Sequence, residues 1–232
     1  MFNNNFVSLS LGSVLHTVNT ISQTGKITGC PTADILPDIN FSHYFSQHTA
    51  LCFGLQNPSL ATKFKIDQNS AFEQNESKQR SLTNKSGYLK FYCSYNYALS
   101  LSKKLNLIFG VGPYLTYSKV LGLDDHQTFY ASSTAPAYTV NYATTYEVYK
   151  VKRWGTGILF FVELEAKLKK DRAFIIRVGY NKGLINFSEN HISNFINGVP
   201  NDIAIVYSNS SGGFVTLGFK LPVFKKYVAI TD

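Results

Sequence analysis

The sequence has few charged residues, since only 16% of its 232 residues are Asp, Glu, Lys or Arg, against about 25% in soluble domains. This low charge is not matched by an excess of apolar residues, because hydrophobic residues make up only 44% of the chain. No run approaches the roughly 18 consecutive apolar residues that indicate a transmembrane helix. Any contact with a membrane must therefore come from strands, whose hydrophobic signal is diluted by alternation.

Cysteine is also scarce. Cys30, Cys52 and Cys93 have no metal-like spacing, and their odd number excludes a complete disulfide framework. We accordingly expect no metal and no cofactor. The opening MFNNNFVSLSLG lacks the basic region and the long apolar region of a signal peptide. We expect either a chain that is not exported by a cleaved signal or a mature chain from which the signal has been removed.

Aromatic residues are plentiful, at 15% of the chain, and many lie in segments where apolar and polar residues alternate. In NLIFGVGPYLTYS, residues 106–118, every second residue from Leu107 to Leu115 is apolar or Pro, which is the period of a β-strand. Many of these segments reach the roughly 9 to 11 residues that a tilted strand needs to cross a bilayer. We predict eight strands, at about 4–14, 34–46, 49–66, 85–100, 104–122, 154–168, 173–186 and 211–224.

The connections between these strands alternate in length. Short turns at 46–49, 101–104 and 169–172 alternate with long polar segments at 15–33, 67–84, 123–153 and 187–210. All long segments then fall at one end, as in outer-membrane barrels. We predict an all-β fold, an eight-stranded antiparallel up-and-down transmembrane β-barrel with long extracellular loops and short periplasmic turns. It would form a single domain over 1–232, with the barrel at about 4–224 and a short periplasmic tail at 225–232.

The two faces of the predicted strands differ in polarity. One face carries no charge, and we assign it to lipid, because no amphipathic helix is predicted to cover it. The other face carries acids and bases that would share a narrow lumen and pair there. This expected lumen network consists of Asp38, Lys90, Glu163, Glu165, Lys167, Arg177 and Lys220. A plugged core is favoured over a selective pore, and an apolar cavity of the lipocalin kind would need the opposite polarity.

Individual residues of the strand at 106–118 fit this interpretation. Gly110 and Gly112 would face the lumen and leave room for long side chains such as Arg177 or Glu163, whereas Pro113 would face lipid and cost one ladder hydrogen bond. An aromatic girdle is expected at the membrane boundary. It would contain Tyr88, Tyr114, Tyr117 and Trp154.

The segment 123–153 is expected to stand above the membrane as a hairpin, because AYTVNYATTYEVYKV alternates again. Its Tyr138, Tyr142 and Tyr146 are candidate contacts for a partner, since Tyr offers a large contact area at little entropic cost. A hairpin that merely stands in solvent or folds over the barrel mouth remains the alternative.

Basic residues gather at the short-turn end. Seven bases (Lys103, Lys104, Lys169, Lys170, Arg172, Lys225 and Lys226) face two acids there, Asp171 and Asp232. Solvated turn lysines and attraction to anionic headgroups or a partner surface explain this rim about equally well. Nucleic acid is not an expected partner, because no aromatic stacking platform accompanies the bases.

An enzyme would need a catalytic constellation, and the candidates are dispersed. Asp124, Asp125 and His126 lie in one predicted loop, while His16 and His191 lie in others, so nothing sets their spacing. His43 and His48 lie near the opposite rim. We predict no catalytic residues and no enzymatic activity, with a loop-based hydrolase or acyl-modifying enzyme, or a narrow pore, as the alternatives.

Several motifs resemble the small outer-membrane β-barrel family of Bacteroidota, known as PorT-like or outer membrane protein beta-barrel domain proteins. They are NYALSLSKKLNLIFGVGPYLTYS, AFIIRVGYNKGLINFS and the closing GGFVTLGFKLPVF. The closing segment is similar to a C-terminal assembly signal, with Gly218, Leu221, Val223 and Phe224 in its positions, although KKYVAITD continues beyond it. The resemblance implies the bacterial outer membrane, contact with its lipid, and an accessory role in a secretion or assembly complex.

Overall fold

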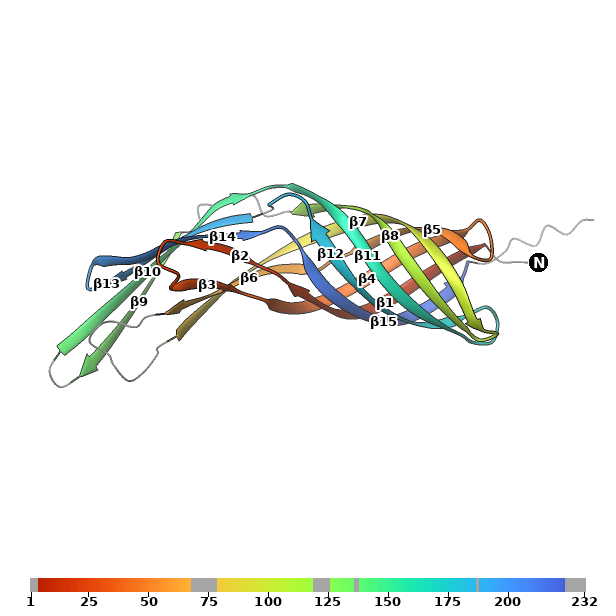
Figure 1. Cartoon of the computed structure of the whole chain (residues 1–232), viewed down its shortest axis with the longest axis horizontal. Coiled ribbons are helices and arrows are strands. Elements are labelled where there is room, and N and C mark those ends of the chain that lie inside the picture. The colour runs from red at the N-terminus through yellow and green to blue at the C-terminus, as the bar shows by residue number, and fades with distance from the viewer. Residues whose placement is uncertain (1–3, 68–78, 119–125, 136–137, 187, 224–232) are drawn as a thin grey trace, which may run out of the picture.

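The structure, a computed structural model, describes residues 4–67, 79–118, 126–135, 138–186 and 188–223 (Figure 1). It is built of strands: β1 Asn5–His16, β2 Asn19–Ser22, β3 Ile27–Cys30, β4 Thr32–Tyr44, β5 Thr49–Gln56, β6 Ser59–Asp67, β7 Gln79–Ser102, β8 Leu105–Ser118, β9 His126–Ala135, β10 Tyr138–Val151, β11 Trp154–Lys167, β12 Ala173–Gly183, β13 Ser188–Ile196, β14 Val199–Ser208 and β15 Gly212–Pro222. Within these ranges no helix is long and apolar enough to cross a membrane.

Eight of the strands close into an antiparallel barrel, which confirms the predicted fold class. Their order is β7-β5-β4-β1-β15-β12-β11-β8, and β8 pairs back onto β7. The barrel forms the right-hand half of Figure 1, with its tight turns at the far right. The ladder between β7 and β8 skips Cys93 and Ser94, which lie opposite Gly112 and Pro113. Pro113 has no N–H group, so the gap in the ladder coincides with a residue that cannot donate a backbone hydrogen bond.

The described parts of the segments predicted as long loops lie mostly in strands. They extend past the barrel in two groups, which we call the extension: a five-stranded sheet β2-β14-β13-β10-β9, and β3 with β6 and the first part of β7 (Figure 1). The two groups share a small apolar core of Ile27, Ile66, Ile192, Ala204 and Val206, with Val18 packed against it. The expected hairpin at 123–153 corresponds to β9 and β10, which pair from Glu147 and His126 to Tyr138 and Ala135. The predicted tail 225–232 lies outside the described residues.

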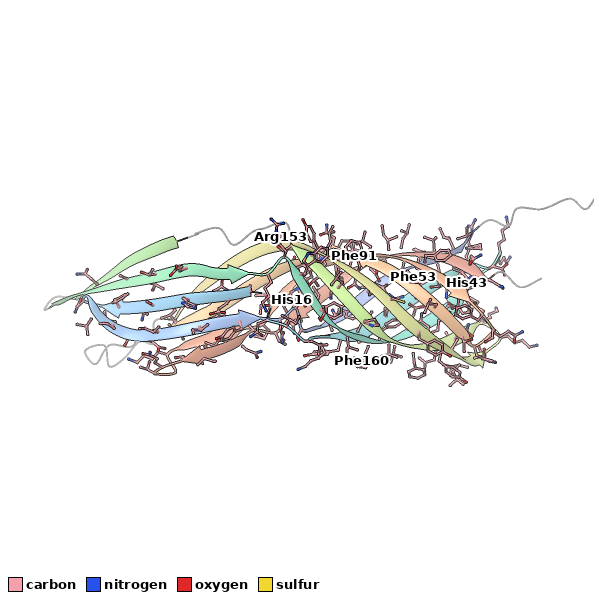
Figure 2. All side chains as sticks on the ribbon, turned by 90° about the horizontal axis from the view of Figure 1, so that it is seen from above. His16, His43, Phe53, Phe91, Arg153 and Phe160 are labelled. Atoms are coloured by element: carbon pink, nitrogen blue, oxygen red, sulfur yellow. The ribbon has the colours of Figure 1, made fainter. Side chains whose placement is uncertain are left out.

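Side chains alternate across the barrel wall as the sequence indicates. Large apolar residues project outward and are exposed, among them Leu9, Phe41, Phe53, Phe91, Phe109, Phe160, Val178 and Leu217 (Figure 2). The residues between them point into the lumen, where buried polar side chains alternate with a second apolar cluster. A soluble protein has the reverse arrangement, so the wall is suited to contact with hydrocarbon.

Inside the barrel, four aromatic rings each cover the glycine directly opposite on the neighbouring strand. They are Tyr92 over Gly54, Tyr114 over Gly157, Phe161 over Gly110 and Phe214 over Gly179. A Cβ atom on Gly110 would lie 2.1 Å from Cζ of Phe161. Gly110 therefore accommodates this aromatic ring rather than the predicted Arg177 or Glu163.

Gly112 has a different role from the one predicted. A Cβ atom there would lie 1.8 Å from the carbonyl oxygen of Cys93. Its missing side chain permits close approach of two backbones, and does not make room for a lumen side chain.

Candidate functional site

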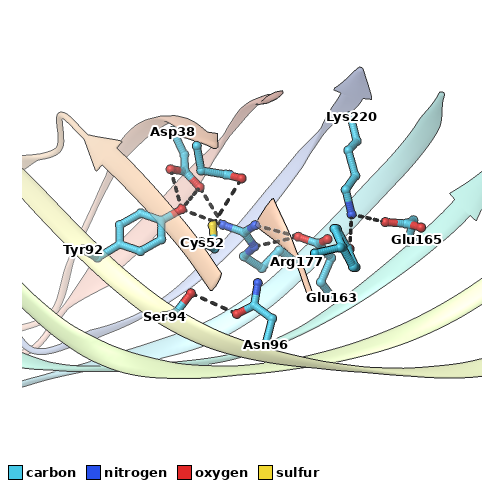
Figure 3. A network of polar contacts seen from close by, with 11 residues as sticks. Asp38, Cys52, Tyr92, Ser94, Asn96, Glu163, Glu165, Arg177 and Lys220 are labelled. Atoms are coloured by element: carbon cyan, nitrogen blue, oxygen red, sulfur yellow. Dashed lines mark hydrogen bonds and ion pairs between the residues drawn. The ribbon is translucent and has the colours of Figure 1, made fainter. Parts of the chain in front are cut away.

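The centre of the lumen is held by the guanidinium of Arg177 on β12. Its Nε donates to Oε2 of Glu163 at 2.8 Å, and its Nη1 donates to Oδ2 of Asp38 at 2.8 Å and to the hydroxyl of Tyr92 at 3.0 Å (Figure 3). The Tyr92 hydroxyl in turn donates to Asp38 Oδ1 at 3.0 Å. The guanidinium also lies 4.3 Å from the ring centroid of Phe161. All of these side chains are buried, and each charged one is bonded to a side chain of opposite charge. Such pairing offsets the cost of burying a charge.

A second buried group lies nearer the short-turn end. Lys220 on β15 donates to Glu165 on β11, and also to the Tyr44 hydroxyl at 2.6 Å. The other oxygen of Glu165 accepts from Nδ2 of Asn106 at 3.0 Å. The Lys220 ammonium lies 4.8 Å from the centroid of the Tyr44 ring and 5.3 Å from that of Phe6. The pair is thus enclosed by hydrogen bonds and aromatic faces, as a buried ion pair requires.

Lys90 differs from the other predicted lumen residues. It is fully buried at 0% exposure and has no hydrogen-bond partner for its Nζ, which lies 4.7 Å from the centroid of the Tyr114 ring. With Lys90 included, the described barrel buries three bases and three acids: Lys90, Arg177 and Lys220, with Asp38, Glu163 and Glu165. Lys167 does not belong to this group, because it is exposed at the end of β11.

The four residues of the expected aromatic girdle do not lie together. Tyr117 and Trp154 pack against each other at the barrel rim, with ring centroids 4.8 Å apart, and Trp154 is 51% exposed. Tyr88 and Tyr114 are only 2% and 3% exposed and point into the lumen, so their assignment to the girdle is wrong. The reason is strand period, since Tyr88 is two residues from the inward Lys90 and Tyr114 two from the inward Thr116. The side chains of Tyr138, Tyr142 and Tyr146 lie outside the description.

The segment that resembles an assembly signal forms the closing strand β15. Gly218 is buried against Ser10 of β1, while Leu221 and Val223 face outward and are exposed. Phe224 lies outside the described residues.

Of the histidines and acids considered for a catalytic group, the structure describes the side chains of His16 on β1 and His191 on β13. His16 is not in a loop, because it lies at the end of β1 and points into the lumen, 6.2 Å from the Tyr88 ring. His191 on β13 contacts Glu189 at 2.9 Å on the extension. Asp124 and Asp125 lie outside the described residues, as does the side chain of His126. In the part of the chain that is described, no cluster of His, Cys, Asp and Glu is suited to a metal ion.

Sequence reasoning missed the lumen tyrosines. Tyr44 and Tyr92 bond directly to Lys220 and Arg177, yet neither was a candidate. The sequence did contain a signal for them, because alternation along a strand places Tyr44 on the same side as the inward Ser42, and Tyr92 on the same side as the inward Ser94.

A patch of isoleucines lies on the outer face of the extension. Ile21 and Ile203 are 65% and 40% exposed, and Ile205, the direct ladder partner of Ile21, is half-buried beside them. We call Ile21, Ile203 and Ile205 the isoleucine patch. These residues lie on β2 and β14, in the sheet that extends past the barrel.

Asp202 on β14 fastens the turn between β2 and β3 to this same sheet. Its carboxylate accepts from the backbone N–H groups of Thr24, Lys26 and Ile27 at 2.9 to 3.0 Å, and from the Ser22 hydroxyl at 2.5 Å. Burial alone would raise the pKa of Asp202, but these hydrogen bonds outweigh burial and hold the pKa below its usual range. The site holds the β2–β3 turn against β14.

Comparison with known proteins places the fold. No protein-family model matches the sequence, and no curated protein matches it. The outer membrane protein OprG of Pseudomonas aeruginosa has a similar structure, with a TM-score of 0.53 and 12% identity over 94% of this chain and 95% of that chain. AlkL in lipid bilayers gives a TM-score of 0.41 at 15% identity, covering 99% and 94%. Ail, the attachment invasion locus protein of Yersinia pestis, gives 0.35 at 8% identity, covering 94% and 99%.

The chain is a bacterial outer-membrane β-barrel protein. Its closed barrel of eight strands with an apolar outer wall, a fold that it shares with OprG, places it there. The apolar wall of the barrel contacts membrane lipid.

Proposed function

We propose that this protein is a non-conducting barrel that anchors its extension above the outer membrane, where the extension binds a partner protein. The observation that carries the proposal is the isoleucine patch, because Ile21 and Ile203 expose apolar surface on the extension, outside the eight-stranded barrel. The filled lumen supports the same proposal. Arg177 and its partners occupy the centre of the barrel and leave the extension as the part available for recognition. The PorT-like motifs suggest a partner from a secretion or assembly complex.

Photo-crosslinking in intact cells tests this proposal. A photoreactive p-benzoylphenylalanine replaces Ile21, and Thr28, which is exposed on the other sheet of the extension, receives the same replacement as a control. We expect one discrete protein adduct from position 21 that disappears when Ile203→Asp is introduced as well. Identical adducts from both positions, or the absence of any protein adduct from position 21, would contradict the proposal.

A further inference from the structure

A cavity of about 380 Å³ opens at the short-turn end of the barrel, away from the extension. Its size is within the range of small-molecule sites, about 300 to 1,000 Å³. The residues that matter for its chemistry are Phe6, Tyr44, Glu165, Lys167, Arg172 and Lys220. The cavity therefore joins the inner ion pair of the lumen to the turn between β11 and β12.

The charged side chains around this cavity differ in whether they have an ion-pair partner. At its inner end Lys220 and Glu165 neutralise each other. At its rim Lys167 and Arg172 are exposed, and the described residues provide neither with an ion-pair partner. Asp171 is the acid that also lines the rim. Two unpaired bases against one acid leave the entrance positive.

The adjacent turn strengthens this positive charge. The backbone N–H of Lys167 donates to the carbonyl oxygen of Lys104 at 2.8 Å, which holds the β7–β8 turn beside the β11–β12 turn. Six exposed bases gather on these two turns: Lys103, Lys104, Lys167, Lys169, Lys170 and Arg172. A group of one sign at the mouth of a cavity raises the local concentration of ligands of opposite sign.

We propose that this cavity is a binding site for a phosphate-bearing ligand. The fork of Arg172 and the ammonium of Lys167 bind the phosphate oxygens, since guanidinium matches phosphate geometry and lysine adds a point charge. The organic part of the ligand packs against Phe6 and Tyr44. The same chemistry is found in a phospholipid headgroup of the adjoining leaflet and in a free phosphorylated solute.

Calorimetric titration of the full chain in a zwitterionic detergent that contains no phosphate tests the site. The two probes are inorganic phosphate and a short-chain phosphatidylglycerol below its micelle concentration, with a short-chain diacylglycerol as the comparison that lacks the phosphate. Saturable binding of either anionic probe supports the proposal, and the tighter of the two identifies the source of the phosphate. If neither anionic probe binds, or if the diacylglycerol binds equally well, the proposal is overturned.

Matched variants separate the cavity from general surface charge. Lys167→Ala with Arg172→Ala should weaken binding by about tenfold or more, the loss expected from one or two charge-assisted hydrogen bonds. Lys103→Ala with Lys104→Ala removes the same charge from the adjacent turn outside the cavity lining, and should change affinity by less than about threefold. Equal losses in the two double variants would overturn the proposal. Arg172→Lys keeps the charge but loses the fork, so it should also weaken binding.

Discussion

Arg177 connects three other side chains of the lumen, since it bonds to Glu163, Asp38 and Tyr92 at once. Its bond to Glu163 follows from local register, because the two residues are direct partners on β11 and β12. Its bond to Asp38 crosses the lumen to a strand 139 residues away in sequence. A single guanidinium thus ties the two halves of the barrel wall together.

Removal of this guanidinium should destabilise the barrel strongly. Arg177→Met leaves Glu163 and Asp38 buried without a bonded base, which costs about 3 to 5 kcal/mol for a broken buried pair. Urea unfolding in lipid vesicles, followed by fluorescence of the single tryptophan, Trp154, measures the loss.

Two further variants check the cause of that loss. Lys182→Met on the same strand removes an exposed base and should have little effect. Adding Glu163→Gln and Asp38→Asn to Arg177→Met should restore more than half of the lost stability, because no uncompensated acid remains. An equal midpoint for Arg177→Met and Lys182→Met would refute the role assigned to Arg177.

Asp202 provides a pH-dependent test at the β2–β3 turn of the extension. Its pKa is held below the ordinary value, so the stabilisation it gives is complete above the unfolded-state pKa of about 3.9 and is lost as the pH falls through the folded pKa. The amide NMR signals of Thr24, Lys26 and Ile27 should therefore shift together, with a midpoint below about 3.9. Asp202→Asn should abolish this shared titration, and a midpoint at or above the ordinary value would count against the hydrogen-bonded carboxylate.

At the scale of elements, the pairing of aromatic rings with glycines makes the inner wall close-packed. Gly110→Ala would place a Cβ atom 2.1 Å from the Phe161 ring, which itself supports Arg177. We expect a loss of about 1 to 3 kcal/mol from overpacking, measured by the same urea unfolding. Gly213→Ala is the matched control, because the nearest atom to its Cβ is 3.9 Å away. Equal stability of the two variants would show that the ring moves aside freely.

Alternation in the sequence was sufficient to predict the barrel strands and the hairpin of β9 and β10, but not β2, β3, β13 and β14 of the extension. The barrel wall has lipid on one side, so apolar and aromatic residues such as Phe91, Cys93 and Tyr95 occupy every second position. In β13, by contrast, the buried face contains Ser188, Asn190, Ile192 and Asn194. A strand that buries polar residues, with water outside it, has no apolar period and was interpreted as a loop.

The contents of the lumen were predictable residue by residue but not pair by pair. The alternation of side chains along each strand identified Asp38, Glu163 and Arg177 as inward residues. The tight turn between β11 and β12 implies the register that pairs Glu163 with Arg177. Which residue Arg177 meets across the lumen depends on strand tilt and stagger, which a single sequence does not specify. For the same reason, the sequence assigned Lys90 correctly to the lumen but could not predict that it has no direct ion pair there.

As a whole molecule, the protein combines a closed barrel in the membrane with a long strand extension beyond it (Figure 1). The buried charges of the barrel are equal in number and opposite in sign, and most are bonded to one another. Side chains rather than solvent fill an eight-stranded lumen of this kind. This arrangement agrees with the proposals that the barrel is an anchor and that recognition takes place at its two ends.

Single-channel recording in planar lipid bilayers tests this account most directly. The full chain should insert without steady ohmic current, because Arg177, Glu163 and Asp38 occupy the centre of the lumen. Insertion is verified separately by the heat-dependent shift in gel mobility that folded barrels show. A stable, linear conductance from correctly inserted protein would contradict the plugged barrel.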